Sequence, residues 1–203
     1  QPGLEVGGLG DFSVGVWGNL DIEDYDGALA DGQFSEVDIY GSYAVPVDVV
    51  DLSVGYTEYA YPGGGEADRE AGVSVGGALE GVDLKAGFFY GVDGAIEKSL
   101  YVELSAGSRF DLTEALGLDV GATVGYIAPD EGDDGFSHYT ASVGLSYSVL
   151  TVGVTYVGQI DDEILADAVT AVAADEAAGV EGVEGVTGYD TEVVGTVGIA
   201  LDF

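Results

Sequence analysis

The chain ends on the stretch T-E-V-V-G-T-V-G-I-A-L-D-F, residues 191–203, in which apolar residues recur at every second position. Successive side chains of an extended strand point to opposite faces of a sheet. One face of this stretch would carry Val193, Gly195, Val197, Ile199, Leu201 and Phe203, and the other Val194, Thr196, Gly198, Ala200 and Asp202. An alternating strand that ends on an aromatic residue is typical of transmembrane β-barrels. The stretch therefore predicts a strand that crosses a membrane.

The same alternation recurs along nearly the whole chain, in segments close to the ~9–11 residues that a tilted strand needs to cross a bilayer. The further segments are residues 12–22, 36–45, 50–61, 72–79, 82–91, 100–110, 116–126, 138–149 and 150–160. Segment 1–8 alternates more weakly. The fold class predicted is all-β, an antiparallel up-and-down barrel with ten strands, or eleven if segment 1–8 is a strand. Because simple bacterial barrels have even numbers of strands, a count of eleven indicates a further strand upstream of residue 1.

The connecting segments alternate between short turns and long loops. The short ones are residues 46–49, 80–81 and 149–150, with a somewhat longer turn at 110–116, and the long ones are 23–33, 62–70, 92–99, 128–135 and 161–190. Outer-membrane barrels have short periplasmic turns and longer extracellular loops. The pattern predicts one domain over residues 1–203 in the bacterial outer membrane, with the carboxyl terminus on the periplasmic side.

The longest loop, residues 161–190, is acidic and rich in alanine, and its sequence leaves two alternatives open. Ile164, Leu165, Ala168, Val169 and Val172 recur at helical spacing after two aspartates that can cap a helix. A short helix in this extracellular loop and a solvated loop without a helix are both compatible with the pattern.

The composition limits the partners of the protein. There are 38 Asp and Glu against 4 Lys and Arg, a net charge of -34, and no cysteine. Phosphate backbones are bound by clustered Lys and Arg, so a nucleic acid is not expected as a partner, and the absence of cysteine excludes disulfides and thiolate metal sites. The acidity is typical of proteins adapted to high salt. Divalent ions that bridge acidic loops are the alternative explanation.

A soluble β-sandwich shows the same alternation, with its apolar faces turned inward. Here the apolar faces are uniformly Val, Leu, Ile and Tyr, and the opposite faces are largely Gly, Ser, Thr and Ala. A sheet face in water would usually carry Lys, Glu and Thr. The pattern favours a membrane barrel whose apolar face contacts outer-membrane lipid.

The face opposite the apolar one is predicted to line the lumen of the barrel. Its charged and aromatic members would be Asp21, Glu36, Asp38, Tyr40, Asp51, Asp83, Lys85, Glu103 and Asp119, among many glycines and serines. Rings of carboxylates favour cations in a pore, so a conducting lumen should prefer cations. Lys85 and Glu103 occupy near-diagonal positions on adjacent predicted strands, which predicts an ion pair between them.

Aromatic residues on the apolar face gather towards the strand ends. They are Tyr43, Tyr56, Tyr90, Tyr126, Tyr147, Tyr156 and Phe203. Amphipathic aromatic rings at the level of the lipid headgroups form girdles in membrane barrels. These seven residues are the predicted girdle.

Three runs in the first half of the chain resemble the TorF-like porins, a Gly-rich family of bacterial outer-membrane barrels. They are Q-P-G-L-E-V-G-G-L-G-D-F-S-V-G-V-W-G-N at 1–19, F-S-E-V-D-I-Y-G-S-Y at 34–43 and D-L-S-V-G-Y-T-E-Y-A-Y-P-G-G-G at 51–65. The resemblance implies a barrel of about 12 strands. It also implies an additional strand before the Q-P segment, and it implies little about the solute.

Two functions from different classes follow. The first is a porin for passive diffusion of small solutes, and the second is a structural barrel with a closed lumen that assembles into arrays or tubes, so that the partners would be solutes or further copies of the chain. An enzyme is not expected, because Ser137 and His138 are neighbours on a strand and should point to opposite faces. No cofactor is expected. Loose Ca²⁺ binding by the acidic runs at 130–134 and 161–163 is the one metal interaction predicted.

Overall fold

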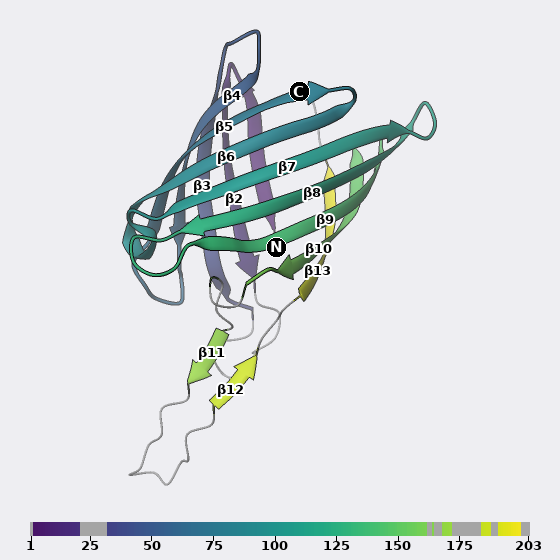
Figure 1. Cartoon of the computed structure of the whole chain (residues 1–203). Coiled ribbons are helices and arrows are strands. Elements are labelled where there is room, and N and C mark those ends of the chain that lie inside the picture. Colours follow the sequence, from purple (N-terminus) through teal and green to yellow (C-terminus); the bar gives the residue numbers. More distant parts are fainter. Residues whose placement is uncertain are drawn as a thin grey trace, which may run out of the picture. The chain divides into compact units, whose positions relative to one another are not determined.

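The described part of the chain is almost entirely β-structure. A computed structural model describes residues 2–20, 32–161, 164, 168–171, 184–187 and 191–199. Eleven strands form one antiparallel up-and-down sheet in the order β1-β2-β3-β4-β5-β6-β7-β8-β9-β10-β13 (Figure 1). The all-β, up-and-down prediction is confirmed. Strands β1 and β13 end this order, so the sheet as it stands is not closed into a barrel.

The strand bounds agree with the alternating segments, including the weak first one. The strands are β1 (Gly3–Leu9), β2 (Phe12–Leu20), β3 (Phe34–Val45), β4 (Asp51–Ala60), β5 (Asp68–Leu79), β6 (Val82–Asp93), β7 (Leu100–Asp111), β8 (Leu116–Ala128), β9 (Gly135–Tyr147), β10 (Leu150–Gln159) and β13 (Thr191–Ile199). Of the two counts left open, eleven is the one observed in the sheet. The chain divides into two compact units, Gln1–Leu104 with Ile127–Gly132 and Ser105–Tyr126 with Asp133–Phe203.

Cross-strand register keeps like residues on like faces of the sheet. Across β2 to β6, one row of paired residues is Phe12, Tyr43, Val54, Val73 and Phe88, and the next row is Ser13, Ser42, Gly55, Gly72 and Phe89. The first row belongs to what we call the apolar face, and the second to the polar face. In the second unit, Val143, Val154 and Gly195 share the apolar face in the same way.

The burial of side chains is the reverse of that in a water-soluble protein. Among the described residues no hydrophobic side chain is buried, whereas Asp68, Ser74, Ser137 and Ser146 are. On the apolar face, Leu4 is 70% and Val197 is 74% exposed. Full exposure of a Val or Leu side chain costs about 1.5–3 kcal/mol relative to burial. The apolar face therefore requires an apolar environment from outside the described chain, which argues against the sandwich alternative.

Short turns and longer connections alternate along the chain, as the sequence predicts. Residues 80–81 form a two-residue hairpin loop between the paired Leu79 and Val82, and both loop residues have positive φ, 51° at Glu80 and 85° at Gly81. That combination is the type I′ turn, whose twist matches the twist of paired strands. The longer connections hold a single helical element in the described residues, the 3-10 turn η1 at Gly94–Ile96.

The loop at 161–190 contains strands where the sequence also allowed a helix. Ala168–Ala171 (β11) and Glu184–Thr187 (β12) pair as a separate two-stranded antiparallel sheet. The helical alternative is therefore not realised at 168–171, where the backbone bonds across to a partner strand. Most other residues of this loop lie outside the described part of the chain, as do Asp21 and Phe203. No helix within the described ranges has the length and apolar character that a membrane crossing requires.

Gly91 provides a test of the β6–η1 connection. Its N–H donates to the carbonyl of Ser99 (2.9 Å), and its own carbonyl accepts from the N–H of Lys98 (2.8 Å). A Cβ at position 91 would collide with the carbonyl oxygen of Ile96. We expect Gly91→Ala to lower the free energy of unfolding by about 1–3 kcal/mol, the usual cost of overpacking.

The matched control is Gly77→Ala, because nothing lies within 4 Å of a Cβ placed there. Its effect should stay within about 0.5 kcal/mol. Urea titrations of both variants, refolded under identical conditions, measure the difference. Equal transition midpoints for the two variants would contradict the assigned connection.

Candidate functional site

The polar face of the first unit is a wall of small residues. Gly15, Ser42, Ser53, Gly55, Ser74, Gly76 and Gly87 lie on it, in the positions that the alternation predicts. Their small size leaves room above the backbone. Large side chains of this face are therefore free to lie down along the sheet instead of standing upright.

The structure places all the described residues of the predicted lumen set on this polar face. Register assigns Glu36, Asp38, Tyr40, Asp51, Asp83 and Lys85 to it. Tyr101 stacks on Phe89 with ring centroids 5.9 Å apart, which puts Tyr101, and Glu103 two positions on, on the same face. In the second unit, Asp119 lies on the corresponding face, since a Cβ at Gly144 would be 3.7 Å from its Cβ.

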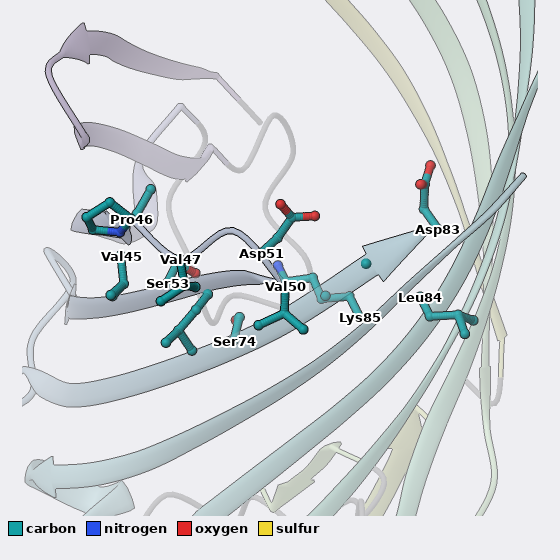
Figure 2. A pocket seen from close by; sticks show the side chains of 14 residues that line it. Val45, Pro46, Val47, Val50, Asp51, Ser53, Ser74, Asp83, Leu84 and Lys85 are labelled. Carbon is teal, nitrogen blue, oxygen red and sulfur yellow. The ribbon is translucent and has the colours of Figure 1, made fainter. Parts of the chain in front are cut away.

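A cavity of about 380 Å³ lies at the turn end of this wall (Figure 2). Asp51, Gly76 and Lys85 form one row across β4, β5 and β6, and Asp83 lies two residues before Lys85. Pro46, Val47 and Val50 of the β3–β4 turn line the same cavity. The carboxylates of Asp51 and Asp83 and the ammonium group of Lys85 therefore line the same cavity.

The predicted ion pair between Lys85 and Glu103 is not formed. No ion pair of the described residues includes Lys85. Because Tyr101 stacks on Phe89, Glu103 lies near the level of Gly87 on β6, about 7 Å along the strand from Lys85. The two residues thus lie near-diagonally on adjacent strands, as the sequence spacing predicts, but their side chains form no ion pair.

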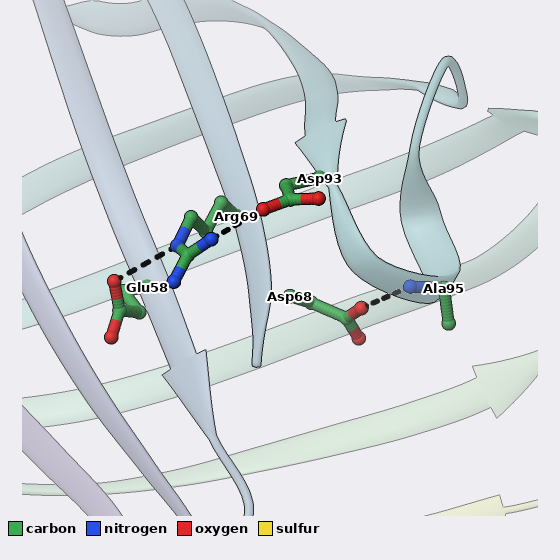
Figure 3. Close-up of polar contacts among 5 residues, drawn as sticks. All are labelled: Glu58, Asp68, Arg69, Asp93 and Ala95. Carbon is green, nitrogen blue, oxygen red and sulfur yellow. Dashed lines mark hydrogen bonds and ion pairs between the residues drawn. The ribbon is translucent and has the colours of Figure 1, made fainter. Parts of the chain in front are cut away.

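At the loop end of the wall, hydrogen bonds fix aromatic and acidic side chains together. The phenol of Tyr59 donates to Glu70 (3.2 Å), and the phenol of Tyr61 donates to Asp68 (2.7 Å). The buried Asp68 also accepts a hydrogen bond from the backbone N–H of Ala95 (Figure 3). These contacts tie β4, β5 and η1 together, so Tyr59 and Asp68 have a structural role.

A charged group lies on the apolar face at the same end. Arg69 forms ion pairs with Glu58 (3.1 Å) and with Asp93, and Figure 3 shows it between them. Sequence reasoning placed Arg69 in a loop and missed this group. The signal was present, because extending the alternation of β5 back to Asp68 puts Arg69 in line with Ala71 and Val73.

The predicted girdle tyrosines lie on the apolar face. Tyr56 and Tyr90 both pair with Ala71, in the row next to the Arg69 group, and are 45% and 46% exposed. The other described members have aromatic neighbours or project outward: Tyr43 packs on Phe12 (4.6 Å between centroids), Tyr126 on Phe136 (5.4 Å) and Tyr156 on Tyr139 (6.0 Å), and Tyr147 is 59% exposed. Aromatic residues thus border the charged row at the loop end.

The second unit carries one arginine on its polar face. Arg109 lies 3.5 Å from Asp119 and 3.8 Å from Asp111. Its guanidinium extends over Gly117, where a Cβ would come within 2.6 Å of Nη2. Acidic neighbours therefore offset the charge of this arginine, as the small number of basic residues in the chain leads one to expect.

Ser137 and His138 are closer than the sequence argument allowed. Ser137 Oγ and His138 Nδ1 are 3.0 Å apart, because the alternation of β9 is interrupted between Phe136 and Tyr139, which are both exposed. The expectation that the two side chains cannot meet is wrong. Nucleophilic attack also requires access to a substrate, and the Ser137 side chain is fully buried at 0% exposure.

The acidic loop at 129–134 makes exposed contacts. Lys98 Nζ lies 3.4 Å from Asp130, and the hydrogen bond to this carboxylate, together with its charge, raises the pKa of Lys98. The phenol of Tyr126 donates to Asp134. Within the described ranges no group of three or more acidic or histidine side chains is arranged to hold a metal ion. Loose Ca²⁺ binding stays a prediction, and two residues of the second acidic run, 162 and 163, lie outside those ranges.

A bacterial protein family matches most of the chain. A family model described as a bacterial protein of unknown function (Gcw_chp) matches residues 1–180. No curated protein matches the chain. The family description does not mention a porin, so the resemblance to TorF-like porins stays a prediction.

The Tyr61–Asp68 contact provides a test of the loop-end assembly. Burial and the hydrogen bond to the Asp68 carboxylate both raise the pKa of Tyr61 above its ordinary value, because both disfavour the phenolate. We expect Asp68→Asn to shift this pKa down, towards the ~10 of an unperturbed tyrosine. Absorbance titrations at high pH, with Tyr61→Phe as the reference that identifies the signal, measure the shift. An unchanged titration in Asp68→Asn would show that the two side chains do not interact.

Proposed function

This chain belongs to the Gcw_chp family of bacterial proteins of unknown function. From its structure we propose that it is an outer-membrane β-barrel through which small solutes diffuse passively. The apolar face would contact lipid, and the polar face would line a lumen that prefers cations. The single observation that carries the proposal is the complete absence of buried hydrophobic side chains from the described sheet. A bilayer supplies the apolar environment that such a face needs.

The height of the apolar face supports a membrane. From Arg69 to Leu79, β5 advances ten residues, about 33 Å of strand at ~3.3 Å per residue. With the ~40° tilt usual in barrels this corresponds to about 25 Å, the height of the apolar band of outer-membrane proteins. Tyr56 and Tyr90 would then lie at the outer headgroup level, with the Arg69 group just beyond them in water.

Closure of the sheet is part of the proposal. The outward edges of β1 and β13 have no neighbour in the described sheet, and unpaired backbone groups in hydrocarbon cost several kcal/mol each. A barrel of about 12 strands, as the TorF-like resemblance implies, would pair both edges through a further strand. Short turns would face the periplasm, as would the carboxyl terminus, and long loops would face outward.

The charges of the polar face support a preference for cations. Six described carboxylates of the predicted lumen set, Glu36, Asp38, Asp51, Asp83, Glu103 and Asp119, stand against Lys85 and the acid-paired Arg109. Acidic rings raise the local concentration of cations in a pore.

A structural barrel with a closed lumen is the second candidate. The polar face carries several large aromatic side chains, namely Trp17, Tyr40, Tyr59, Phe89 and Tyr101. Such side chains fill the interior of narrow barrels. Bilayer recordings distinguish the candidates, since a closed barrel would give no conductance steps.

The ion preference is tested by reversal potentials in a salt gradient across a planar bilayer. We expect a potential of the sign for cation selectivity. It should move towards zero in Asp51→Asn/Asp83→Asn, because two carboxylates of the wall are removed. The matched control is Glu131→Gln/Asp133→Asn, which removes two exposed loop charges and should leave the potential nearly unchanged. Anion selectivity of the unmodified protein would contradict the proposal.

The lipid-facing assignment is tested with two neighbouring lysine substitutions at the centre of β10. Val154 is 52% exposed on the apolar face, and Thr155 lies opposite Ser142 on the polar face. A lysine facing lipid at the bilayer midplane costs about 2–4 kcal/mol. Val154→Lys should therefore lower the free energy of unfolding in lipid vesicles by about that amount, and Thr155→Lys by much less. Similar losses in both variants would exclude lipid contact at Val154.

A further inference from the structure

A second cavity, of about 230 Å³, lies on the polar face of the first unit over strands β3 to β6. Its floor includes Gly55 and Gly72, which lie opposite each other on β4 and β5. Ser53 and Ser74 pair in the adjacent row and also line the cavity. The backbone at Gly55 is thus open to a bound molecule, with hydroxyl groups beside it, whereas the ring of Phe89 covers Gly72.

One hydroxyl of this cavity belongs to a buried residue and has no hydrogen-bond partner among the described residues. Ser74 is 9% exposed, and no hydrogen bond of its side chain to the described residues is found. The hydroxyl of Ser53 likewise makes none, in contrast to Ser42, which shares a hydrogen bond of 2.8 Å with Ser13. The Ser74 hydroxyl oxygen is not among the enclosed side-chain atoms that lack a partner, so it is accessible from the cavity. A ligand with hydroxyl groups would replace water as the hydrogen-bond partner of Ser74.

An aromatic ring lies flat beside these hydroxyls. A Cβ at Gly72 or at Gly87 would come within 2.5 Å of the ring of Phe89, so the ring covers both glycines, and Phe89 lines the cavity. Tyr101 stacks on it at 27° between ring planes. Tyr40, on the other side of the cavity, lies over Gly15 in a similar way. Flat rings beside unpaired hydroxyls offer an apolar surface and hydrogen bonds to the same molecule.

The two charged residues of the cavity lie far apart along the strands. Glu70 and Lys85 both line it. Glu70 and Gly76, which lies opposite Lys85, are six residues apart on β5, about 20 Å of strand. The serines and glycines between these two positions carry no charge. A neutral molecule with one apolar face and several hydroxyls matches the centre of the cavity better.

We propose that this cavity is a binding subsite for a single sugar ring. The C–H face of the ring would stack on Phe89, and its hydroxyls would hydrogen-bond with Ser53 and Ser74. The volume lies below the ~300–1,000 Å³ of pockets for drug-sized ligands, which limits the ligand to about one ring. The subsite depends on the proposed pore in one respect, because the sugar would reach it through the lumen.

The experiment has two independent readouts, with D-glucose as the probe. The first is saturation-transfer NMR of glucose with the full chain in detergent micelles, which reports binding without conduction. The second is the fall in single-channel current when glucose is added on one side of a planar bilayer. We expect saturation transfer to glucose and a concentration-dependent reduction of the current.

The test variant is Phe89→Ala, and Phe88→Ala is its matched control. Phe88 is the adjacent residue on β6, 47% exposed on the apolar face. An aromatic contact typically contributes ~1 kcal/mol, so glucose affinity should fall roughly fivefold in Phe89→Ala and stay unchanged in Phe88→Ala. Ser53→Ala/Ser74→Ala should weaken binding as well, and it keeps the test valid if Phe89→Ala does not fold.

The outcomes separate the subsite from the pore. Conductance steps without current reduction or saturation transfer would overturn the subsite and leave the pore standing. Saturation transfer that depends on Phe89, in the absence of steps, would support the subsite and contradict the pore. Equal loss of binding in Phe88→Ala and Phe89→Ala would also overturn the subsite, because only Phe89 faces the cavity.

Discussion

Contact between the apolar face and an apolar environment is the constraint on which the rest of this structure depends. Register pairs Phe12, Tyr43, Val54, Val73 and Phe88 in one row, so neighbouring strands add to one continuous surface. None of these side chains is buried by the described chain. At about 25 cal/mol per Å² of apolar area, a surface of this kind does not remain in water. The hydrophobic stabilisation of this sheet must therefore come largely from its surroundings.

Because the large apolar residues lie on one face of the sheet, the other face can carry small residues. Glycine and serine leave room for Phe89 to lie across Gly72 and Gly87, and for Tyr40 to lie over Gly15. A glycine in a strand often marks a close approach by another group, and here that group is an aromatic ring. The same residues that would widen a lumen also allow flat rings on its wall. The small residues of the polar face thus account both for the open space above the sheet and for the aromatic rings that lie on it.

The large negative charge is distributed in two ways. Some carboxylates are tied into local structure, as Asp68 is with Tyr61 and Ala95, and Glu58 and Asp93 are with Arg69. Others, such as Asp51 and Asp83, line a cavity near Lys85, which has no ion-pair partner among the described residues. The first kind limits how the strand ends move. The second kind sets the electrostatic potential along the polar face.

The sequence by itself determined the strands, their antiparallel order and the face on which each residue lies. A period of two depends only on the geometry of an extended backbone, which is why ten strands could be assigned from the sequence, whereas the weaker alternation of segment 1–8 left a count of ten or eleven open. The positions of Asp38, Asp51 and Lys85 on the polar face follow from the same periodicity.

Only the tertiary structure decided which side chains of a face meet. Lys85 and Glu103 form no ion pair, an irregularity in β9 brings Ser137 to His138, and cross-strand bonding makes a strand of Ala168–Ala171. Arg69 forms ion pairs with Glu58 and Asp93 because the three residues lie opposite one another on β4, β5 and β6, although they are far apart in the sequence. Alternation sets the direction of a side chain, but the offset of each strand along its neighbour is set by turns, bulges and packing.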